Sequence, residues 1–448
     1  MIIDEDLVKT LLGRLFPINR SLTGPGNRET LGILSELIPL SLYEVPSGTK
    51  CYDWTVPPEW RIREAWIKDK AGKTVVDFAN NNLHVVNGST PFRGHLTFKE
   101  LKPRLHTLPK MPTAIPYKTT YYKPDWGFCL SQEAMNKMDQ NSDYEVCIDS
   151  SLLENGSLTY ADSIKRGDSG KEYLISTYLC HPSLANDNLS GLVLATLLFR
   201  QLLEMKTRHS YRLVIVPETI GAIVYLSQNR RAMTAIAGGY VITTVAGPGP
   251  FGYKESFLGS HEIDSAAKLA LSRHPHKGFP FVPDGSDERQ YSSPGFRIPT
   301  GTITKDKYYD YKEYHTSLDN LEFISPLYLL ETLDIYRRAI SYLEMNVKFK
   351  RIQPHCEFML GPRGLYPNLG GEYGQPAVLD GSHQEHYYGT HGKQNRGADL
   401  DAMQWWMFAG DGQTSTLDLS LRSGMSPDVL FQAAKSMEAV GLLMEVVL

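Results

Sequence analysis

The sequence predicts an α/β protein built on a mixed, mostly parallel sheet that is flanked by helices. From Tyr173 onward, short apolar runs alternate with longer helical patterns: YLISTYL, GLVLATLLFRQLLE, YRLVIVP, AIVYLSQNRRA and GGYVITTVA. This alternation is typical of βαβ units, whose strands pair in parallel. A hydrophobic content of 42% and a charged content of 21% over 448 residues are ordinary for a globular chain with a sizeable core.

The amino-terminal part predicts helices that lead into this sheet. Residues 5–40 contain one or two helical patterns joined by the polar stretch NRSLTGPGNRE, and LYEVPSG then indicates a strand that ends at a turn. Strand IPTGTIT and a helix over residues 327–345 complete the α/β domain. We expect this domain to comprise residues 1–50 and 150–396, with an irregular segment between residues 349 and 396.

Residues 51–149 have a different character. They are rich in aromatic, proline and β-branched residues in short runs such as AWIKDKAGKTVVDF and LHVVNGSTPFRGHLTF, which turn signals separate. We therefore expect a small β-rich domain inserted in the α/β domain.

Residues 397–448 predict three helices followed by a strand, which is the outline of a winged helix-turn-helix domain. From residue 399 to the end, only Arg422 and Lys435 are cationic, against seven carboxylates. Neutralisation of phosphates supplies most non-specific affinity for DNA, so this charge argues against nucleic-acid binding. A packing or protein-contact role fits the composition better.

Composition also indicates in which cellular compartment the protein is expected. A net charge of −4 gives no general attraction to nucleic acids or anionic membranes. No apolar run approaches the ~18 residues of a membrane span, and the first twenty residues lack the basic flank of a signal peptide. The five cysteines form no CxxC pair, which argues against a disulfide framework or a cysteine zinc site. We expect a cytoplasmic protein.

The most informative stretch is the loop that follows the strand beginning at Tyr173. It contains His181 and Asp187, and ligands collect beyond the carboxyl ends of strands in open α/β sheets. An imidazole and a carboxylate in one loop can converge on zinc. The alternative is that Asp187 caps the following helix while His181 satisfies a buried hydrogen bond.

Three further clusters lie at predicted strand ends of the same domain. Glu218 follows a strand and is placed to act as a general base, or to stabilise a helix amino terminus. In the loop DGSDERQY, Asp287 is a candidate ligand or an acceptor that orients a histidine, while Arg289 and Tyr291 are candidates to steady an oxyanion. His315, in KEYHTSLDN, could close a metal site from the opposite side.

The sequence motifs around His181, Glu218, Asp287 and His315 follow one another in the order found in the zinc aminopeptidase superfamily. More closely, RSLTG, YDWTVP, CHPSLANDNLSG, GSDERQY and EYHTSLDN resemble the bacterial aminopeptidase-like family, and the resemblance covers essentially the whole chain. It implies a zinc-aminopeptidase-like catalytic domain with an inserted small domain and a carboxyl-terminal winged helix-turn-helix. Residue by residue, it implies metal binding by His181, Asp187 and His315 and the general-base role for Glu218.

Two departures from the superfamily pattern bear on the number of ions. The usual pair of glutamates is here Glu218 followed by Thr219, and the segment YVITTVAGPG lacks the usual aspartate ligand. What remains suits one zinc ion with an open position better than two. In this reading Asp287 is a supplementary ligand or supporting acceptor, and Arg20 and Tyr291 are candidate substrate contacts.

The resemblance implies a zinc-dependent amide-bond hydrolase, most simply an aminopeptidase, in which Glu218 takes a proton from zinc-activated water. Two alternatives stay open: hydrolysis of an amide in an amino-sugar or surface-polysaccharide precursor, and a degraded metallopeptidase scaffold with a binding or regulatory role. The expected partner is a peptide or a small aminoacylated substrate, without nucleic acid or membrane. A homo-oligomer is left open.

Overall fold

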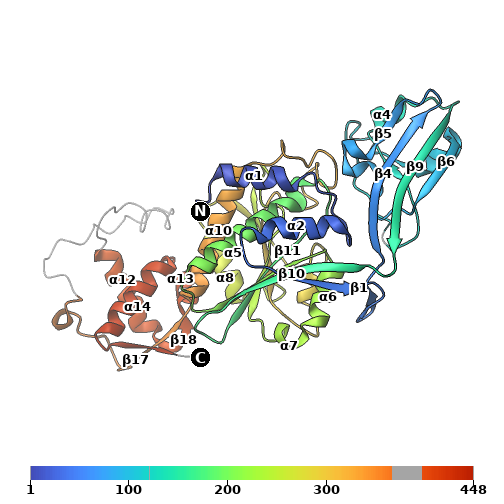
Figure 1. Ribbon diagram of the computed structural model, residues 1–448. Coiled ribbons are helices and arrows are strands. Elements are labelled where there is room, and N and C mark those ends of the chain that lie inside the picture. The colour runs from blue at the N-terminus through green and yellow to red at the C-terminus, as the bar shows by residue number, and fades with distance from the viewer. Residues whose placement is uncertain (1, 121, 366–395, 447–448) are drawn as a thin grey trace. The chain divides into compact units, whose positions relative to one another are not determined.

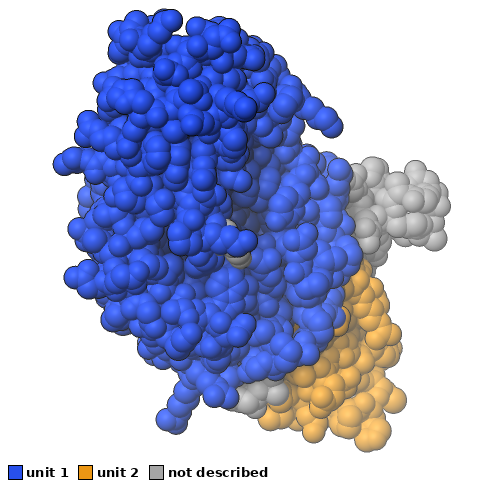
Figure 2. All heavy atoms as spheres, turned by 90° about the vertical axis from the view of Figure 1, so that its right-hand side faces the viewer, with its two compact units in different colours: residues 1–259, 274–334 blue, residues 260–273, 335–448 orange. Residues whose placement is uncertain are grey.

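The computed structural model describes residues 2–120, 122–365 and 396–446 (Figure 1). The chain folds into two compact units, shown in different colours in Figure 2. Unit 1 comprises residues 1–259 and 274–334, and unit 2 comprises residues 260–273 and 335–448. Every predicted site residue lies in unit 1.

The centre of unit 1 is a mixed eight-stranded sheet. Its order is β1 (Ser41–Pro46), β10 (Ser157–Lys165), β12 (Ser210–Val216), β11 (Glu172–Tyr178), β13 (Gly238–Val241), β16 (Thr300–Lys305), β14 (Phe251–Lys254) and β15 (His276–Phe279). The four middle strands, β12, β11, β13 and β16, pair in parallel. Strands β11 and β12 are buried along almost their whole length, which explains their near-continuous apolar sequences.

Helices pack on this sheet as the alternation predicts. Outside residues 50–153, unit 1 contains helices α1 (Glu5–Leu15), α2 (Pro25–Ser35), α5 (Gly191–Glu204), α6 (Ile220–Gln228), α7 (Arg230–Met233) and α9 (Glu288–Tyr291), with the π-turn η4 (Ala185–Ser190) before α5. Helix α5 packs on β11 and β12, and α6 on β10 and β12. Asp4 caps α1 by accepting a hydrogen bond from the backbone of Leu7 at 3.0 Å.

Residues 50 to 153 form a second layer of β-structure, visible in Figure 1 as a separate sheet. An antiparallel sheet has the order β5 (Thr74–Asp77), β4 (Glu59–Asp69), β9 (Asp143–Leu153) and β6 (Phe92–Thr97). The short elements around it are β2 (Lys50–Cys51), β3 (Trp54–Thr55), β7 (Leu105–His106), β8 (Phe128–Cys129), α3 (Phe98–Leu101), α4 (Gln132–Asn136), η1 (Phe78–Asn80), η2 (Asn82–His84) and η3 (Lys102–Arg104). This layer has its own apolar core, which includes Trp60, Phe128 and Tyr144. We call residues 50–153 the insert.

Unit 2 combines helices with a small antiparallel sheet. Its elements are α8 (Glu262–Leu271), β17 (Lys348–Arg351), η5 (Gly361–Arg363), α12 (Arg396–Ala409), β18 (Asp411–Ser415), α13 (Thr416–Ser423), α14 (Pro427–Ala439) and β19 (Leu443–Val446), and α10 (Pro326–Glu344) enters it from unit 1. Strand β17 lies between β18 and β19. The winged-helix interpretation and the domain boundaries stay predictions, and much of the irregular segment falls outside the described residues.

The sequence did not indicate every strand. The three helices and final strand expected at the carboxyl end did not include β18, which forms because β17 supplies backbone partners from Lys348 to Lys350. The sequence also gave no prediction of strands β10, β14, β15 and β17. Two of them have weak strand signals, because β15 is largely exposed and polar and β14 contains a glycine. Among the described residues, no helix is long and apolar enough to cross a membrane.

The core of unit 2 makes a stability prediction. Trp406 is fully buried, donates a hydrogen bond to the carbonyl oxygen of Leu430 at 2.7 Å and packs edge-on against Phe349. We expect Trp406→Ala to lower the free energy of unfolding by about 3–5 kcal/mol in denaturant titrations. Phe408→Ala, in the same helix but 79% exposed, is the matched control and should change it by less than about 1 kcal/mol. Equal losses in the two variants would contradict this packing.

Candidate metal centre

The site lies beyond the carboxyl ends of two neighbouring parallel strands. The register pairs Tyr178 of β11 with Val216 of β12, so the residues that follow each strand emerge side by side. Three residues after β11 the chain reaches His181, and two residues after β12 it reaches Glu218. Parallel pairing therefore brings together two segments that are far apart in the sequence.

Asp187 and His315 complete the cluster. Asp187 is in η4, which leads into α5, and His315 is in the loop that follows β16. His181 Nε2 lies 3.9 Å from Asp187 Oδ2 and 3.8 Å from Glu218 Oε2. His315 Nε2 lies 2.9 Å from the same Asp187 oxygen. The structure thus brings together all four residues that the sequence singled out most strongly.

The three predicted ligands fit a metal ion. His181, Asp187 and His315 each offer a donor atom, and these atoms lie within 4.8 Å of one another. Two ligands bound about 2.0 Å from one ion at a tetrahedral angle are about 3.3 Å apart, which falls between the measured separations. Asp187 Oδ2 and His315 Nε2 are buried, and among the described residues neither has a hydrogen-bond partner apart from their close approach to each other. Buried polar atoms with so few partners are expected where an ion binds.

Burial and charge set suitable protonation states for two of these ligands. Burial lowers the pKa of His181 to about 4, although the Asp187 carboxylate opposes it, so the imidazole is neutral at pH 7. Burial alone would raise the pKa of Asp187, but His181 and His315 bring it down to about 2. A neutral imidazole and an ionised carboxylate are the forms that bind metal.

The two oxygens of Asp187 have different surroundings. Its Oδ1 accepts a hydrogen bond from the hydroxyl of Tyr178 at 2.6 Å, and that hydroxyl also lies 2.7 Å from Thr243 Oγ1. Only Oδ2 faces the histidines. Tyr178 is fully buried, so this bond is shielded from water. One oxygen of the carboxylate is thereby already engaged by the protein.

Asp319 holds the loop that carries Asp187. Its carboxylate accepts hydrogen bonds from the backbone N–H groups of Asn186 at 2.6 Å and Asp187 at 3.0 Å, and from the hydroxyl of Tyr311 at 3.1 Å. Burial nevertheless raises the pKa of Asp319 to about 7. The sequence placed this aspartate near His315 but gave it no role, because only the fold shows which loop it reaches.

Glu218 is the one carboxylate of the cluster with access to solvent, its side chain being 24% exposed. Burial, followed by the charges of Asp287 and Asp187, raises the pKa of Glu218 well above its usual range. The next residue, Thr219, has a backbone φ of 64°. This left-handed turn directly follows the candidate base, and a β-branched residue adopts it only where neighbours enforce it.

The DGSDERQY loop provides that support through two of its three candidate residues, and the third lies elsewhere. Asp287 accepts the backbone N–H of Thr219 at 2.7 Å, and Arg289 Nη2 donates to Thr219 Oγ1 at 3.1 Å. Burial raises the pKa of Asp287 to about 7. Tyr291 does not reach the cluster: its ring is fully buried in the apolar core, and its hydroxyl pairs with Ser176 at 2.8 Å. Asp287 and Arg289 therefore support the turn beside the base.

Arg20 lies behind His181 rather than on an open face. It is 1% exposed, and its guanidinium donates to the carbonyl oxygens of His181 at 3.0 Å and Leu15 at 2.6 Å. Burial lowers the pKa of Arg20 to about 10. These contacts fix the backbone of a ligand, so in this structure Arg20 positions His181 from within the protein.

Cys180 is close to the cluster as well. Its thiol, with His181 and Glu218, forms a second group of metal-binding residue types, and it accepts the backbone N–H of Glu218 at 3.3 Å. Burial raises the pKa of Cys180 well above its usual range. Zinc binds the thiolate, so the neutral thiol favours the group with His315.

The insert contributes a residue that the sequence did not indicate. The ring of Tyr117 lies 5.3 Å from that of His181 and 5.2 Å from that of His315, measured between centroids. Its backbone N–H donates to the carbonyl oxygen of His315 at 2.8 Å, and a β-bridge joins Pro116 to Thr316. No local pattern could reveal this contact, because the two segments are almost two hundred residues apart.

Comparison with known proteins places this site in a family. A family model described as "Domain of unknown function (DUF4910)" matches residues 9–346. A protein of Clostridium acetobutylicum named "Putative polysaccharide biosynthesis protein with aminopeptidase-like domain" is 41% identical over 440 residues, which are 97% of this chain and 95% of that protein. These matches confirm the family resemblance seen in the sequence.

Solved structures agree on the fold. The crystal structure of a "putative peptidase" from Clostridium acetobutylicum is 39% identical and covers 99% of this chain and 96% of its own, with a TM-score of 0.88. The structure of BSAP, a zinc aminopeptidase from Bacillus subtilis, covers 76% of this chain and 95% of its own, with a TM-score of 0.56 at 11% identity. The latter likeness shows an aminopeptidase-like fold alone.

The support from Asp319 can be tested by zinc affinity. In Asp319→Asn, an amide N–H would face one of the two backbone N–H groups that the carboxylate now accepts, and the Asp187 loop would lose a bond. We expect zinc affinity to fall about 10- to 100-fold in competition titrations with a chelator. Asp310→Asn is the control. The Asp310 side chain is half exposed and forms a surface ion pair with Lys307 at 3.6 Å. Unchanged affinity in Asp319→Asn would contradict the role given to Asp319.

Proposed function

The chain belongs to the bacterial aminopeptidase-like family matched by DUF4910, and we propose that it is a zinc-dependent amide-bond hydrolase, most simply an aminopeptidase. The observation that carries the proposal is the convergence of His181, Asp187 and His315 beside Glu218 at the strand ends. A zinc ion held by these three residues would polarise the scissile carbonyl and make water more acidic.

We propose one ion rather than two. The positions that would supply further carboxylates are Thr219 and the Thr243–Thr244 segment, and Thr219 Oγ1 accepts a hydrogen bond from Arg289. Asp187 Oδ1 is bonded by Tyr178, so only Oδ2 is directed toward the histidines. A guanidinium beside Thr219 and a single available oxygen on Asp187 both disfavour a second cation there.

The protein's own groups supply the remaining chemistry. Glu218 would take a proton from the attacking water and pass it to the leaving amine, which its position beside His181 and its partial exposure favour. The Tyr117 hydroxyl makes no hydrogen bond to another described residue, while its ring packs against both histidines. It is therefore available to donate a hydrogen bond to the carbonyl oxygen as negative charge develops there.

The name of the homologue motivates a second candidate, cleavage of an amide in an amino-sugar or surface-polysaccharide precursor. The same metal-binding group and base would serve it, so substrates must decide. A panel of aminoacyl anilides and N-acylated amino sugars, assayed with zinc, separates the two. A purified, folded chain that takes up no zinc at micromolar levels would favour the degraded-scaffold alternative instead. The winged-helix unit is assigned a packing or protein-contact role in each case.

Removal of the base gives the first test of the mechanism. We expect Glu218→Gln to lower kcat by about 10²- to 10⁴-fold, because no carboxylate then accepts the proton from water. Zinc content, measured by elemental analysis, should stay near one ion per chain in the variant and in the wild type. Glu204→Gln, whose side chain is 66% exposed at the end of α5, is the control. Wild-type turnover by Glu218→Gln, or two tightly held ions per chain, would refute the corresponding part of the proposal.

The hydroxyl of Tyr117 can be removed without disturbing its ring. We expect Tyr117→Phe to lower kcat/KM about 10²-fold, as loss of a donor to a developing oxyanion does, with zinc content unchanged. Tyr43→Phe serves as control. Tyr43 lies in β1, an edge strand of the eight-stranded sheet, and stacks on Tyr160. If Tyr117→Phe keeps the wild-type kcat/KM, the tyrosine serves packing only.

A further inference from the structure

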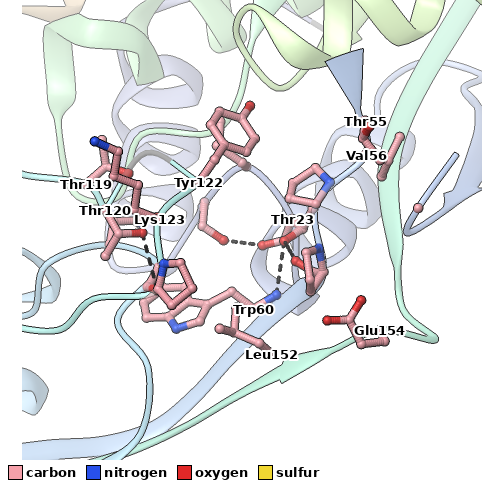
Figure 3. Close-up of a pocket in the computed structure, with 18 residues that line it drawn as sticks. Thr23, Thr55, Val56, Trp60, Thr119, Thr120, Tyr122, Lys123, Leu152 and Glu154 are labelled. Carbon is pink, nitrogen blue, oxygen red and sulfur yellow. Dashed lines mark hydrogen bonds between the residues drawn. The ribbon is translucent and has the colours of Figure 1, made fainter. Parts of the chain in front are cut away.

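Unit 1 contains a pocket that the catalytic residues do not use. It has a volume of about 450 Å³, within the range of small-ligand sites. Its walls come from the RSLTG turn, from the hairpin formed by β2 and β3, and from the insert (Figure 3). Figure 2 views unit 1 from the side of the insert and shows that this face is hollowed.

The lining is mostly apolar. Six of its residues offer aliphatic or proline surface: Leu22, Val56, Pro57, Pro58, Pro124 and Leu152. Tyr122 adds a ring that meets Trp54 edge-on at 5.6 Å. The charged residues Lys123 and Glu154 are exposed and lie on opposite sides of the pocket in Figure 3. Water therefore reaches the charges, while the apolar side chains form the walls.

Several polar side chains of the lining already have partners in the protein. Thr23 Oγ1 accepts the backbone N–H of Trp60 at 3.0 Å and donates to the carbonyl oxygen of Pro58 at 3.2 Å. The indole N–H of Trp60 donates to Ser89 O at 2.9 Å, and the amide of Asn87 donates to Arg20 O at 3.2 Å. A sugar ring that entered would leave hydroxyls unpaired, which is costly, whereas an aromatic or aliphatic group would not.

One extended segment connects this pocket to the metal centre. Tyr117 packs on both histidines, and Thr119 and Thr120 line the pocket. The backbone between them is paired with Asn87, which accepts from Thr120 at 3.0 Å and donates to Lys118 O at 2.8 Å. The same stretch of the insert therefore contributes to both the candidate metal centre and the pocket wall.

We propose that this pocket binds an aromatic or branched aliphatic group of the substrate. The inference rests on the proposed amide hydrolase and adds its substrate class: amides whose acyl or amino-acid part carries a large apolar group. The pocket selects that group by burying it among prolines, leucines and Tyr122. Lys123 and Glu154 meet the solvated part of the substrate at the rim.

The test uses N-phenyl-1-naphthylamine, an apolar fluorescent probe, titrated against the full chain. Leu152→Glu adds a charge to the wall at a leucine that is 37% exposed, so the fold should tolerate it. Leu42→Glu, at a 46% exposed strand leucine outside the lining, is the matched control. We expect wild type and Leu42→Glu to bind the probe alike and Leu152→Glu to bind it at least tenfold more weakly.

Equal probe binding by all three proteins, no binding by the wild type, or stronger binding of N-acetylglucosamine than of the probe would overturn the assignment. With active enzyme, Leu152→Glu should raise KM about tenfold for leucyl and phenylalanyl anilides relative to alanyl anilide. Probe binding needs neither zinc nor turnover. If the chain is inactive but Leu152→Glu weakens probe binding, the proposed function is wrong and the apolar site stands. If the chain is active but Leu152→Glu does not weaken probe binding, the proposed function stands and the apolar site is wrong.

Discussion

The site depends on how one fully buried carboxylate, Asp187, is accommodated. An ionised carboxylate with no partner in the interior costs several kcal/mol, so each of its oxygens must find a positive or donating group. Tyr178 satisfies Oδ1 from the same strand that leads to His181, and the two histidines face Oδ2. Asp319 does not touch this carboxylate but fixes the backbone that carries it. The two histidines and Oδ2 together form a group that could hold a metal ion.

The sheet and its neighbours determine the rest of the geometry. Parallel pairing of β11 with β12 sets His181 beside Glu218, and Arg20 prevents the His181 backbone from moving away by holding its carbonyl oxygen. On the other side, Asp287 and Arg289 both bind Thr219 and so hold the left-handed turn after the base. The candidate ligands and the candidate base are thus positioned by different elements that meet only in the folded chain.

Local pattern predicted the α/β class and the apolar strands that end at the site, and the family resemblance then selected the four residues that converge there. It was not enough for residues whose direction depends on distant contacts. Tyr291 is only four residues from Asp287, yet its ring packs in the apolar core and its hydroxyl pairs with Ser176 of β11. Tyr117 belongs to the insert, and β18 forms only because β17 is beside it. In each case the missing information was a long-range contact rather than a local propensity.

The insert contributes residues to the candidate metal centre itself. Ser317 donates its backbone N–H to Ile115 O at 2.8 Å, and its hydroxyl accepts the backbone N–H of Ile115 at 3.0 Å. These two hydrogen bonds join the loop that carries His315 to the segment of the insert around Ile115, and each segment stabilises the other. The same segment continues into the pocket wall, so one stretch of the insert contributes to both the candidate metal centre and the pocket. Under the proposed function, metal chemistry and substrate selectivity reside on separate parts of one unit, joined through Tyr117.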